Sequence, residues 1–281
     1  MAPREDYDAT LAAIAGLVAD LEREAGAETT AGATVGATVG IGIPGMVSPA
    51  TGLVKNANST WLIGQPFDRD LAARLKRPVR VANDANCFAL SEAVDGAAAG
   101  ADPVFGVILG TGVGGGLVVG GRPVVGANAI GGEWGHNPLP WPRDDERPGP
   151  RCYCGQHGCI ETFLSGPGLQ RDHERAGGAA GDAAQIARRA AAGEAAAGAT
   201  LARYAERLAR ALAHVVNIVD PEVIVLGGGL SNIDGLTEDV PRAWGRHVFS
   251  DSVATRLVRA AHGDASGVRG AAWLWEEDEA P

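Results

Sequence analysis

The chain has 281 residues, of which 46% are hydrophobic and 21% are charged, and its formal net charge at pH 7 is −10. This length is enough for one large domain or for two lobes with separate cores. The acidic balance argues against a surface that binds nucleic acid, and no apolar run reaches the roughly 18 residues that span a bilayer. The first residues carry no signal-peptide pattern, so we expect a cytoplasmic protein without a membrane partner.

Hydrophobic periodicity predicts alternating helices and strands. Apolar residues repeat at steps of three and four between residues 7 and 21, which indicates an amphipathic helix, and a Gly/Ala/Thr linker over 26–34 follows. The later strands are expected over 37–43, 79–82, 104–109, 117–119, 123–125, 223–226 and 253–259, and the later helices over 68–75, 85–98, 182–192, 200–219 and 266–275. Gly120-Gly121 predicts a hairpin turn. Many of the 41 glycines cluster at strand ends, which favours an α/β protein whose turns approach a ligand closely.

Asp84 follows a predicted strand and precedes a predicted helix, where α/β proteins bind their ligands. A carboxylate at such a place could take a proton from a substrate hydroxyl as that hydroxyl attacks. The alternative is that Asp84 simply caps the helix over 85–98, a role that suits aspartate. The pattern leaves both open, while Asn83 and Asn86 add hydrogen-bonding groups beside it.

Two glycine-rich turns follow apolar strands. The first comprises Gly110, Thr111 and Gly112, and the second comprises Gly227, Gly228 and Gly229. The first turn could cradle phosphate through its backbone N–H groups. It also fits G-x-G-x-x-G, but it opens a β-hairpin, whereas a dinucleotide-binding motif must open a helix. The second turn is either a tight strand-to-helix connection or a surface over which a nucleotide base or ribose passes.

Three of the four cysteines, Cys152, Cys154 and Cys159, lie within eight residues, and His136 lies upstream across a loop. Three thiolates and one imidazole complete a tetrahedral set for Zn²⁺, and four protein ligands leave no open position, so the zinc is expected to be structural. The alternative is a disulfide with a spare thiol, although a cysteine-poor chain without a secretory signal favours a reducing compartment. Such a metal clip would hold Glu133 and Glu161 in a fixed relation.

These segments together resemble the ROK family (repressor, open reading frame, kinase). Glu133, Gly135 and His136, followed by C-x-C-G-x-x-G-C-x-E over 152–161, match the family hallmark. Residues 83–86 look like its catalytic aspartate segment, 110–112 like its second phosphate loop, and 223–229 like its adenosine segment. Residues 56–61 and 135–141 look most like the bacterial fructokinases, including those that also take mannose. The resemblance runs from near residue 1 to residue 275.

The resemblance implies an α/β fold of the actin-like ATPase (ribonuclease H-like) type, with two lobes and a cleft between them. The first lobe would span 1–102 and be completed by a helix over 266–281, and the second lobe would span 103–265. ATP with Mg²⁺ would phosphorylate a hexose, foremost D-fructose to fructose 6-phosphate, with Asp84 as general base.

The resemblance also implies ligand contacts and a homodimer. The expected sugar contacts are Asn58, Asn83, Glu133, His136 and Glu161, and the expected nucleotide contacts are the two glycine turns. The chain departs from the family in one respect, because it contains no D-x-G-G-T-K phosphate turn. We therefore expect a first lobe truncated at its N-terminus, from a mis-assigned start or in a repurposed relative. The departure keeps a second hypothesis open, a sugar-binding ROK relative without catalysis. A ROK repressor would carry a helix-turn-helix domain, which is not evident before residue 30.

Overall fold

A computed structural model describes residues 6–25 and 38–275. Within them the helices are α1 (Tyr7–Glu24), α2 (Phe67–Leu75), α3 (Asp84–Val94), α4 (Ile160–Leu164), α5 (Gly166–Arg175), α6 (Ala183–Ala191), α7 (Ala195–Val219), α8 (Leu236–Trp244) and α9 (Ser266–Ala272). The strands are β1 (Val39–Ile43), β2 (Met46–Val47), β3 (Val54–Lys55), β4 (Val79–Asn83), β5 (Val104–Leu109), β6 (Val113–Val119), β7 (Arg122–Pro123), β8 (Val223–Gly227) and β9 (Arg256–Arg259). The predicted α/β class is confirmed.

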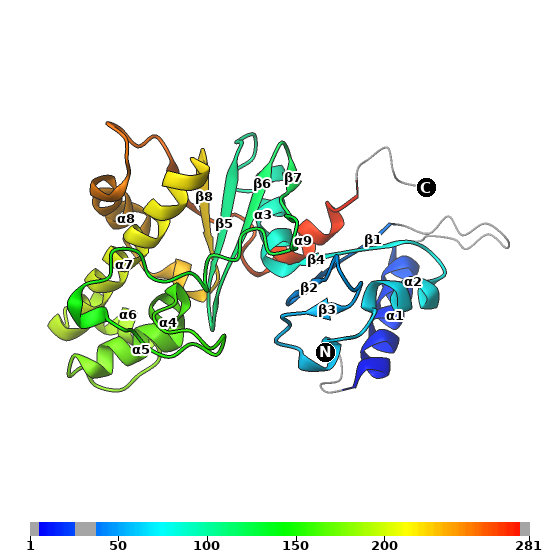
Figure 1. Cartoon of the computed structure of the whole chain (residues 1–281), viewed down its shortest axis with the longest axis horizontal. Coiled ribbons are helices and arrows are strands. Elements are labelled where there is room, and N and C mark those ends of the chain that lie inside the picture. The colour runs from blue at the N-terminus through cyan, green and yellow to red at the C-terminus, as the bar shows by residue number, and fades with distance from the viewer. Residues whose placement is uncertain (1–5, 26–37, 276–281) are drawn as a thin grey trace.

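The elements gather in two groups (Figure 1). The N-terminal group contains α1, α2 and β1–β4, the C-terminal group contains β5–β9 and α4–α8, and α3 and α9 lie between them. The N-terminal group has its own apolar cluster, which includes Leu11, Ile43 and Phe67. Helix α3 contacts β1 and β4 as well as β5 and β6. The lobe boundary that we expect at residue 102 therefore stays a prediction.

A five-stranded sheet in the order β7-β6-β5-β8-β9 forms the centre of the C-terminal group. Gly120 and Gly121 both have positive φ and join β6 to antiparallel β7, which confirms the predicted hairpin. Strands β5 and β8 are parallel neighbours, with Ile108 opposite Gly227. Because both strands end at the same edge, the two glycine turns that follow them are brought together.

Alternating side chains on β8 serve the two faces of this sheet, as the two-residue period of a strand requires. Ile224 and Leu226 join the core beneath α7, whereas Val223 and Val225 pack with α3. Helix α3 approaches β6 very closely because Gly116 has no side chain: a Cβ there would come within 2.5 Å of the Ala85 carbonyl oxygen. This close approach places the first turn of α3 directly against β6.

Helix α9 returns the C-terminal part of the chain to the N-terminal group. A side chain at Gly40 of β1 would collide with the carbonyl of Ala271, and one at Gly270 would collide with the carbonyl of Cys87 in α3. The helix expected over 266–275 is thus present, in slightly shorter form, and packs against both β1 and α3.

Several predicted elements need correction. Helices α4, α5 and α8 were not predicted: α4 is only one turn long, Pro167 and neighbouring glycines in α5 read as a loop, and Pro241 interrupts the pattern of α8. The helix expected over 85–98 ends at Val94. Just beyond this end, the carboxylate of Glu92 accepts the N–H of Ala97 at 2.8 Å. The linker expected over 26–34 and the tail at 276–279 lie outside the described residues. Among the described helices, none is long and apolar enough to cross a membrane.

Candidate active site

Asn83, not Asp84, is the N-cap of α3. Its side-chain oxygen accepts the backbone N–H groups of Ala85 at 2.9 Å and of Asn86 at 3.4 Å, and its amide nitrogen donates to the carbonyl of Gly45 at 3.2 Å. Asn83 therefore takes the capping role that was the alternative explanation for an aspartate at position 84. The placement of Asn83 at the end of β4 is as predicted, and a contact between Asn83 and a sugar stays a prediction.

The Asp84 carboxylate stands in the first helical turn and has a surface open to solvent. Desolvation by the surrounding protein is the largest influence on it and raises its pKa above the usual value, while the N–H of Ala85 and the amide of Asn83 act in the opposite direction. A carboxylate with a raised pKa is a better proton acceptor than an ordinary one at neutral pH.

Glu133 lies within electrostatic reach of the other two acids predicted from the sequence, Asp84 and Glu161. Desolvation raises the pKa of Glu133, and the negative charges of Asp84 and Glu161 raise it further, whereas His136 and Lys55 lower it. The backbone beside Glu133 is anchored to β6, because the indole N–H of the next residue, Trp134, donates to the Gly114 carbonyl at 3.0 Å. The structure thus brings together three carboxylates from distant segments, as expected.

Glu161 lies against the first glycine turn. One of its carboxylate oxygens accepts the backbone N–H of Val113 at 2.9 Å, and a Cβ at Gly112 would come within 2.7 Å of that oxygen. Its own backbone N–H donates to the carbonyl of Gly135 at 2.9 Å. Gly112 is therefore required by the close approach of Glu161, which holds the segment around His136 beside the turn.

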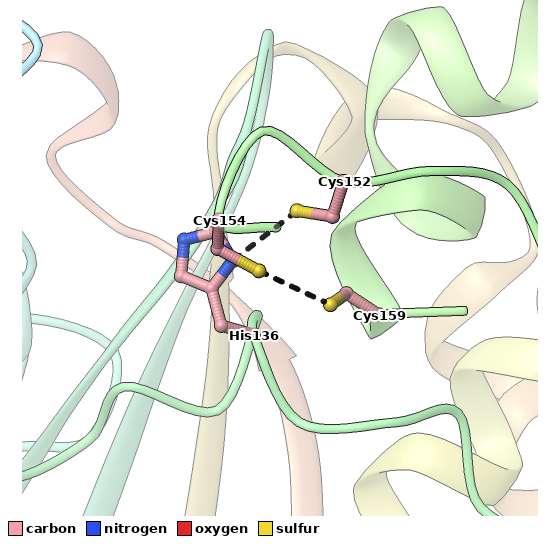
Figure 2. A group of neighbouring side chains, drawn as sticks. All are labelled: His136, Cys152, Cys154 and Cys159. Atoms are coloured by element: carbon pink, nitrogen blue, oxygen red, sulfur yellow. Dashed lines mark hydrogen bonds between the residues drawn. The ribbon is translucent and has the colours of Figure 1, made fainter. Parts of the chain in front are cut away.

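His136, Cys152, Cys154 and Cys159 converge as predicted, and their ligand atoms all lie within 4.8 Å of one another (Figure 2). The Sγ atom of Cys152 is 3.5 Å from Nδ1 of His136, and the Sγ atoms of Cys154 and Cys159 are 3.6 Å apart. A disulfide needs about 2.0 Å between its sulfurs, so the alternative of a disulfide with a spare thiol is wrong here. The spacing fits tetrahedral coordination of one zinc ion.

The surroundings of these side chains also suit a metal. Nε2 of His136 lies 2.9 Å from the Tyr153 hydroxyl, which orients the ring with Nδ1 toward the three sulfurs. Burial raises the pKa of Cys152 and raises that of Cys159 to about 12, whereas the N–H of Gln156 lowers the pKa of Cys154. Because zinc binds thiolates, loading the site must displace protons from the buried thiols.

A cavity of about 1030 Å³ opens beside the two glycine turns. Gly110, Thr111 and Gly229 line it, as expected for nucleotide contacts, but Gly112, Gly227 and Gly228 do not. These three glycines shape the turns instead. Gly228 has φ +80° and presses against the backbone of Leu109, and Gly227 lies against the ring of Phe88.

The other walls of this cavity were not predicted from the sequence. They come from α5, α6, α7 and the short helical turn Gly229–Asn232, and they include Gly166, Gln170, Arg188, Ala202 and Asn232. A signal for α5 was present in Ser165-Gly166-Pro167, because Ser165 caps that helix by accepting the N–H of Gly168, with Pro167 in its first turn.

Asn58 is exposed in the loop after β3. This loop lies near Asn83 because Gly45, whose carbonyl Asn83 holds, packs tightly against the backbone of Lys55 and Ala57. A contact between Asn58 and a ligand stays a prediction. Lys55 was not predicted as a site residue, yet its charge lies within electrostatic reach of Glu133 and lowers the pKa of that carboxyl.

The fold and the site define an α/β protein with a Cys₃His cluster beside paired glycine turns. The model of the ROK family matches residues 1–278, and the chain belongs to that family. Over 276 residues it is 43% identical to the N-acetyl-D-glucosamine kinase of Escherichia coli O1:K1. The matched region is 97% of this chain and 88% of that kinase.

Solved structures agree with this assignment. The ROK hexokinase from Thermus thermophilus superposes with a TM-score of 0.82 at 34% identity, covering 96% of this chain and 87% of the hexokinase. A ROK family glucokinase from Streptomyces griseus, in complex with glucose and AMPPNP, gives 0.73 at 26% identity, covering 95% and 87%. The chain therefore has the actin-like ATPase fold of the ROK sugar kinases.

Proposed function

We propose that this protein is an ATP-dependent sugar kinase that phosphorylates the 6-hydroxyl of a hexose, foremost D-fructose. One observation carries the proposal: Glu133 stands within electrostatic reach of both Asp84 and Glu161, and Glu161 accepts the N–H of Val113, directly after the glycine turn that lines the large cavity. An acceptor hydroxyl held by the acids and a phosphate held by the turn would meet in one place. The similarity to kinases that bear hexose and aminosugar names supports the sugar kinase activity, without singling out fructose.

In this proposal Asp84 accepts the proton of the attacking hydroxyl, a task that its raised pKa favours. The sugar hydroxyls are held by polar groups of both chain halves: Asn58, Asn83, Glu133, His136 and Glu161. Backbone N–H groups of Gly110, Thr111 and Gly112 take the phosphates, and the cavity takes the nucleoside. A Mg²⁺ ion bound with ATP would neutralise charge on the transferring phosphoryl group.

The preferred sugar is a finer question. Fructose is favoured by the resemblance of residues 56–61 and 135–141 to fructokinases, with mannose as a further substrate. N-acetyl-D-glucosamine is the second candidate, because the kinases of that name are 43% identical over nearly the whole chain. Discrimination between hexoses depends on a few hydrogen bonds, so either sugar fits the same set of acids.

The deciding experiment measures hexose-dependent ADP release with Mg-ATP and a panel of fructose, mannose, glucose and N-acetylglucosamine. We expect the highest kcat/KM for fructose. A higher value for N-acetylglucosamine would replace fructose with the aminosugar. Sugar binding without ADP release, by the given chain and by a form that carries a D-x-G-G-T-K turn, would support the non-catalytic sugar binder instead.

Further parts of the proposal concern the metal and the assembly. The Cys₃His cluster holds one structural zinc ion, since its four ligands leave no position for a substrate. The working unit is a homodimer in the cytoplasm, and the two lobes divide at residue 102. Sedimentation of the purified protein tests the dimer.

A further inference from the structure

Lys55 joins the two groups of elements at the candidate sugar site. It ends β3 in the N-terminal group, and its ammonium nitrogen donates to the backbone carbonyl of Asn128 at 2.5 Å. Asn128 belongs to the loop that leads from β7 to Glu133 in the C-terminal group. The two residues are 73 positions apart in the sequence. A single side chain of one group thus holds the backbone of the other.

The loop that Lys55 holds is folded tightly enough to transmit its position to Glu133. Within it Ala129 donates to Gly126 at 3.1 Å, Gly131 donates to Val125 at 3.0 Å, and Glu133 donates to Ile130 at 3.1 Å. The loop also packs closely at its end, where Gly132 presses against the backbone of β6. Moving Asn128 therefore moves the segment that carries Glu133.

Lys55 also contacts the segment next to Asp84. The turn at Gly45 has φ +92° and packs against the carbonyl of Lys55, and the carbonyl of Gly45 accepts the amide of Asn83. A continuous set of contacts thus runs from Asn83 through Gly45 and Lys55 to Asn128. It connects the residue before Asp84 with the loop that carries Glu133.

The charge of Lys55 suits this place. Three carboxylates, Asp84, Glu133 and Glu161, crowd the same region, and their mutual repulsion favours a nearby cation. The other lysine of the chain, Lys76, is exposed at the C-terminal end of α2. It therefore provides a matched comparison of the same residue type.

We propose that Lys55 is a positioning residue for the hexose. Its bond to Asn128 ties the Glu133 loop to the N-terminal group and so sets the spacing between the acids that hold the sugar hydroxyls. The inference rests on the proposed hexose kinase function. Lys55 acts through Glu133 on sugar binding and takes no part in proton transfer.

The test compares Lys55→Met, Lys55→Arg and Lys76→Met by steady-state kinetics with fructose and ATP, together with thermal unfolding of each variant. The bond is exposed to solvent, so its loss is expected to raise KM for fructose about 2- to 10-fold in Lys55→Met. KM for ATP and the unfolding midpoint should stay near the wild-type values. Lys55→Arg should recover most of the loss, and Lys76→Met should behave as wild type.

The outcomes separate this inference from the proposed function. Wild-type turnover with an unchanged fructose KM in Lys55→Met overturns the role of Lys55 and leaves the kinase proposal standing. Equal increases of KM for fructose and ATP, or failure of arginine to recover binding, also overturn it, because they indicate a general structural role. If the wild-type chain neither binds nor phosphorylates any hexose, the proposed function is overturned, and this inference with it.

Discussion

The carboxylate of Glu161 accepts the backbone N–H of Val113 at 2.9 Å. Glu161 lies two residues after Cys159 of the metal cluster, and Val113 directly follows the glycine turn at the cavity. The metal cluster and the candidate phosphate turn are therefore fixed to each other through one side chain. Glu161, expected only to bind sugar, thus also supports the proposed phosphate turn.

Replacing Glu161 should consequently disturb both ligands. Glu161→Ala leaves the N–H of Val113 without its partner, at a cost of about 1–3 kcal/mol, and frees the turn to shift. We expect KM to rise for both hexose and ATP. Glu133→Ala is the matched variant and should raise KM for the hexose alone. Steady-state kinetics with each substrate varied in turn make the comparison, and an unchanged ATP KM in Glu161→Ala would contradict the proposed link.

The metal cluster should contain one zinc ion per chain. Cys154→Ser removes one thiolate and should abolish stoichiometric zinc and lower the unfolding temperature, because structural zinc contributes directly to folding free energy. Elemental analysis and thermal unfolding provide the measurements. Cys87→Ala is the control, since Cys87 is buried in α3 and is outside the cluster. Full zinc content in Cys154→Ser, or none in the well-folded wild type, would show that these residues do not form a zinc site.

Asp84→Asn should abolish phosphorylation while retaining sugar affinity. Loss of a general base reduces kcat by about 10²- to 10⁴-fold. In the wild type, kcat/KM should fall as the pH drops through the raised pKa of Asp84, because the base must be deprotonated to act. The measurements are the pH profile of kcat/KM and a sugar titration of the variant. Equal turnover in Asp84→Asn would remove Asp84 as the base.

The same substitution makes a prediction about stability. A folded-state pKa above the unfolded value means that folding favours the protonated carboxyl, so this contribution is present at low pH and is lost as the pH rises through the folded pKa. At neutral pH the ionised carboxylate therefore costs stability, and Asp84→Asn should unfold at the same or a higher temperature than the wild type. The difference should shrink in acid. Marked destabilisation of the variant at neutral pH would contradict this account.

Glu146 should be the acid on which stability depends most clearly. It is buried between Arg207 and Arg210 of α7, and the shortest contacts to each are 2.8 Å. Burial alone would raise the pKa of Glu146, but hydrogen bonds from Arg210 and Arg207 outweigh it and lower the pKa to about 2. Glu146→Ala leaves two buried guanidinium groups without this partner and should cost about 3–5 kcal/mol in urea unfolding.

The pH dependence of this contribution has a defined sign. Because the folded pKa lies below the unfolded value of about 4.3, the stabilisation is complete above that pH and is lost as the pH falls toward about 2. The control is Arg23→Ala, whose pair with Asp20 is exposed and should change stability by less than about 1 kcal/mol. A similar small effect for Glu146→Ala would mean that the buried network does not stabilise the fold.

The sequence by itself determined the features that depend on local spacing. Each of these features is set by residues that are close together in the sequence. They are the three cysteines within eight residues, Asp84 between a strand and a helix, and the glycine pair at 120 and 121. Apolar periodicity located most helices and strands, since each buries one face. It failed for α4, α5 and α8, where proline, glycine or shortness hides the period.

Only the tertiary structure decided which distant segments meet. Parallel pairing of β5 with β8 put two glycine turns, more than 100 residues apart in the chain, at one edge. It also showed that Asn83 is the N-cap of α3, with Asp84 in the first helical turn, and that Gly227 and Gly228 shape a turn without lining the cavity. The contact of Lys55 with Asn128 has no trace in local pattern. Such contacts depend on how strands and helices pack, which short-range propensity does not specify.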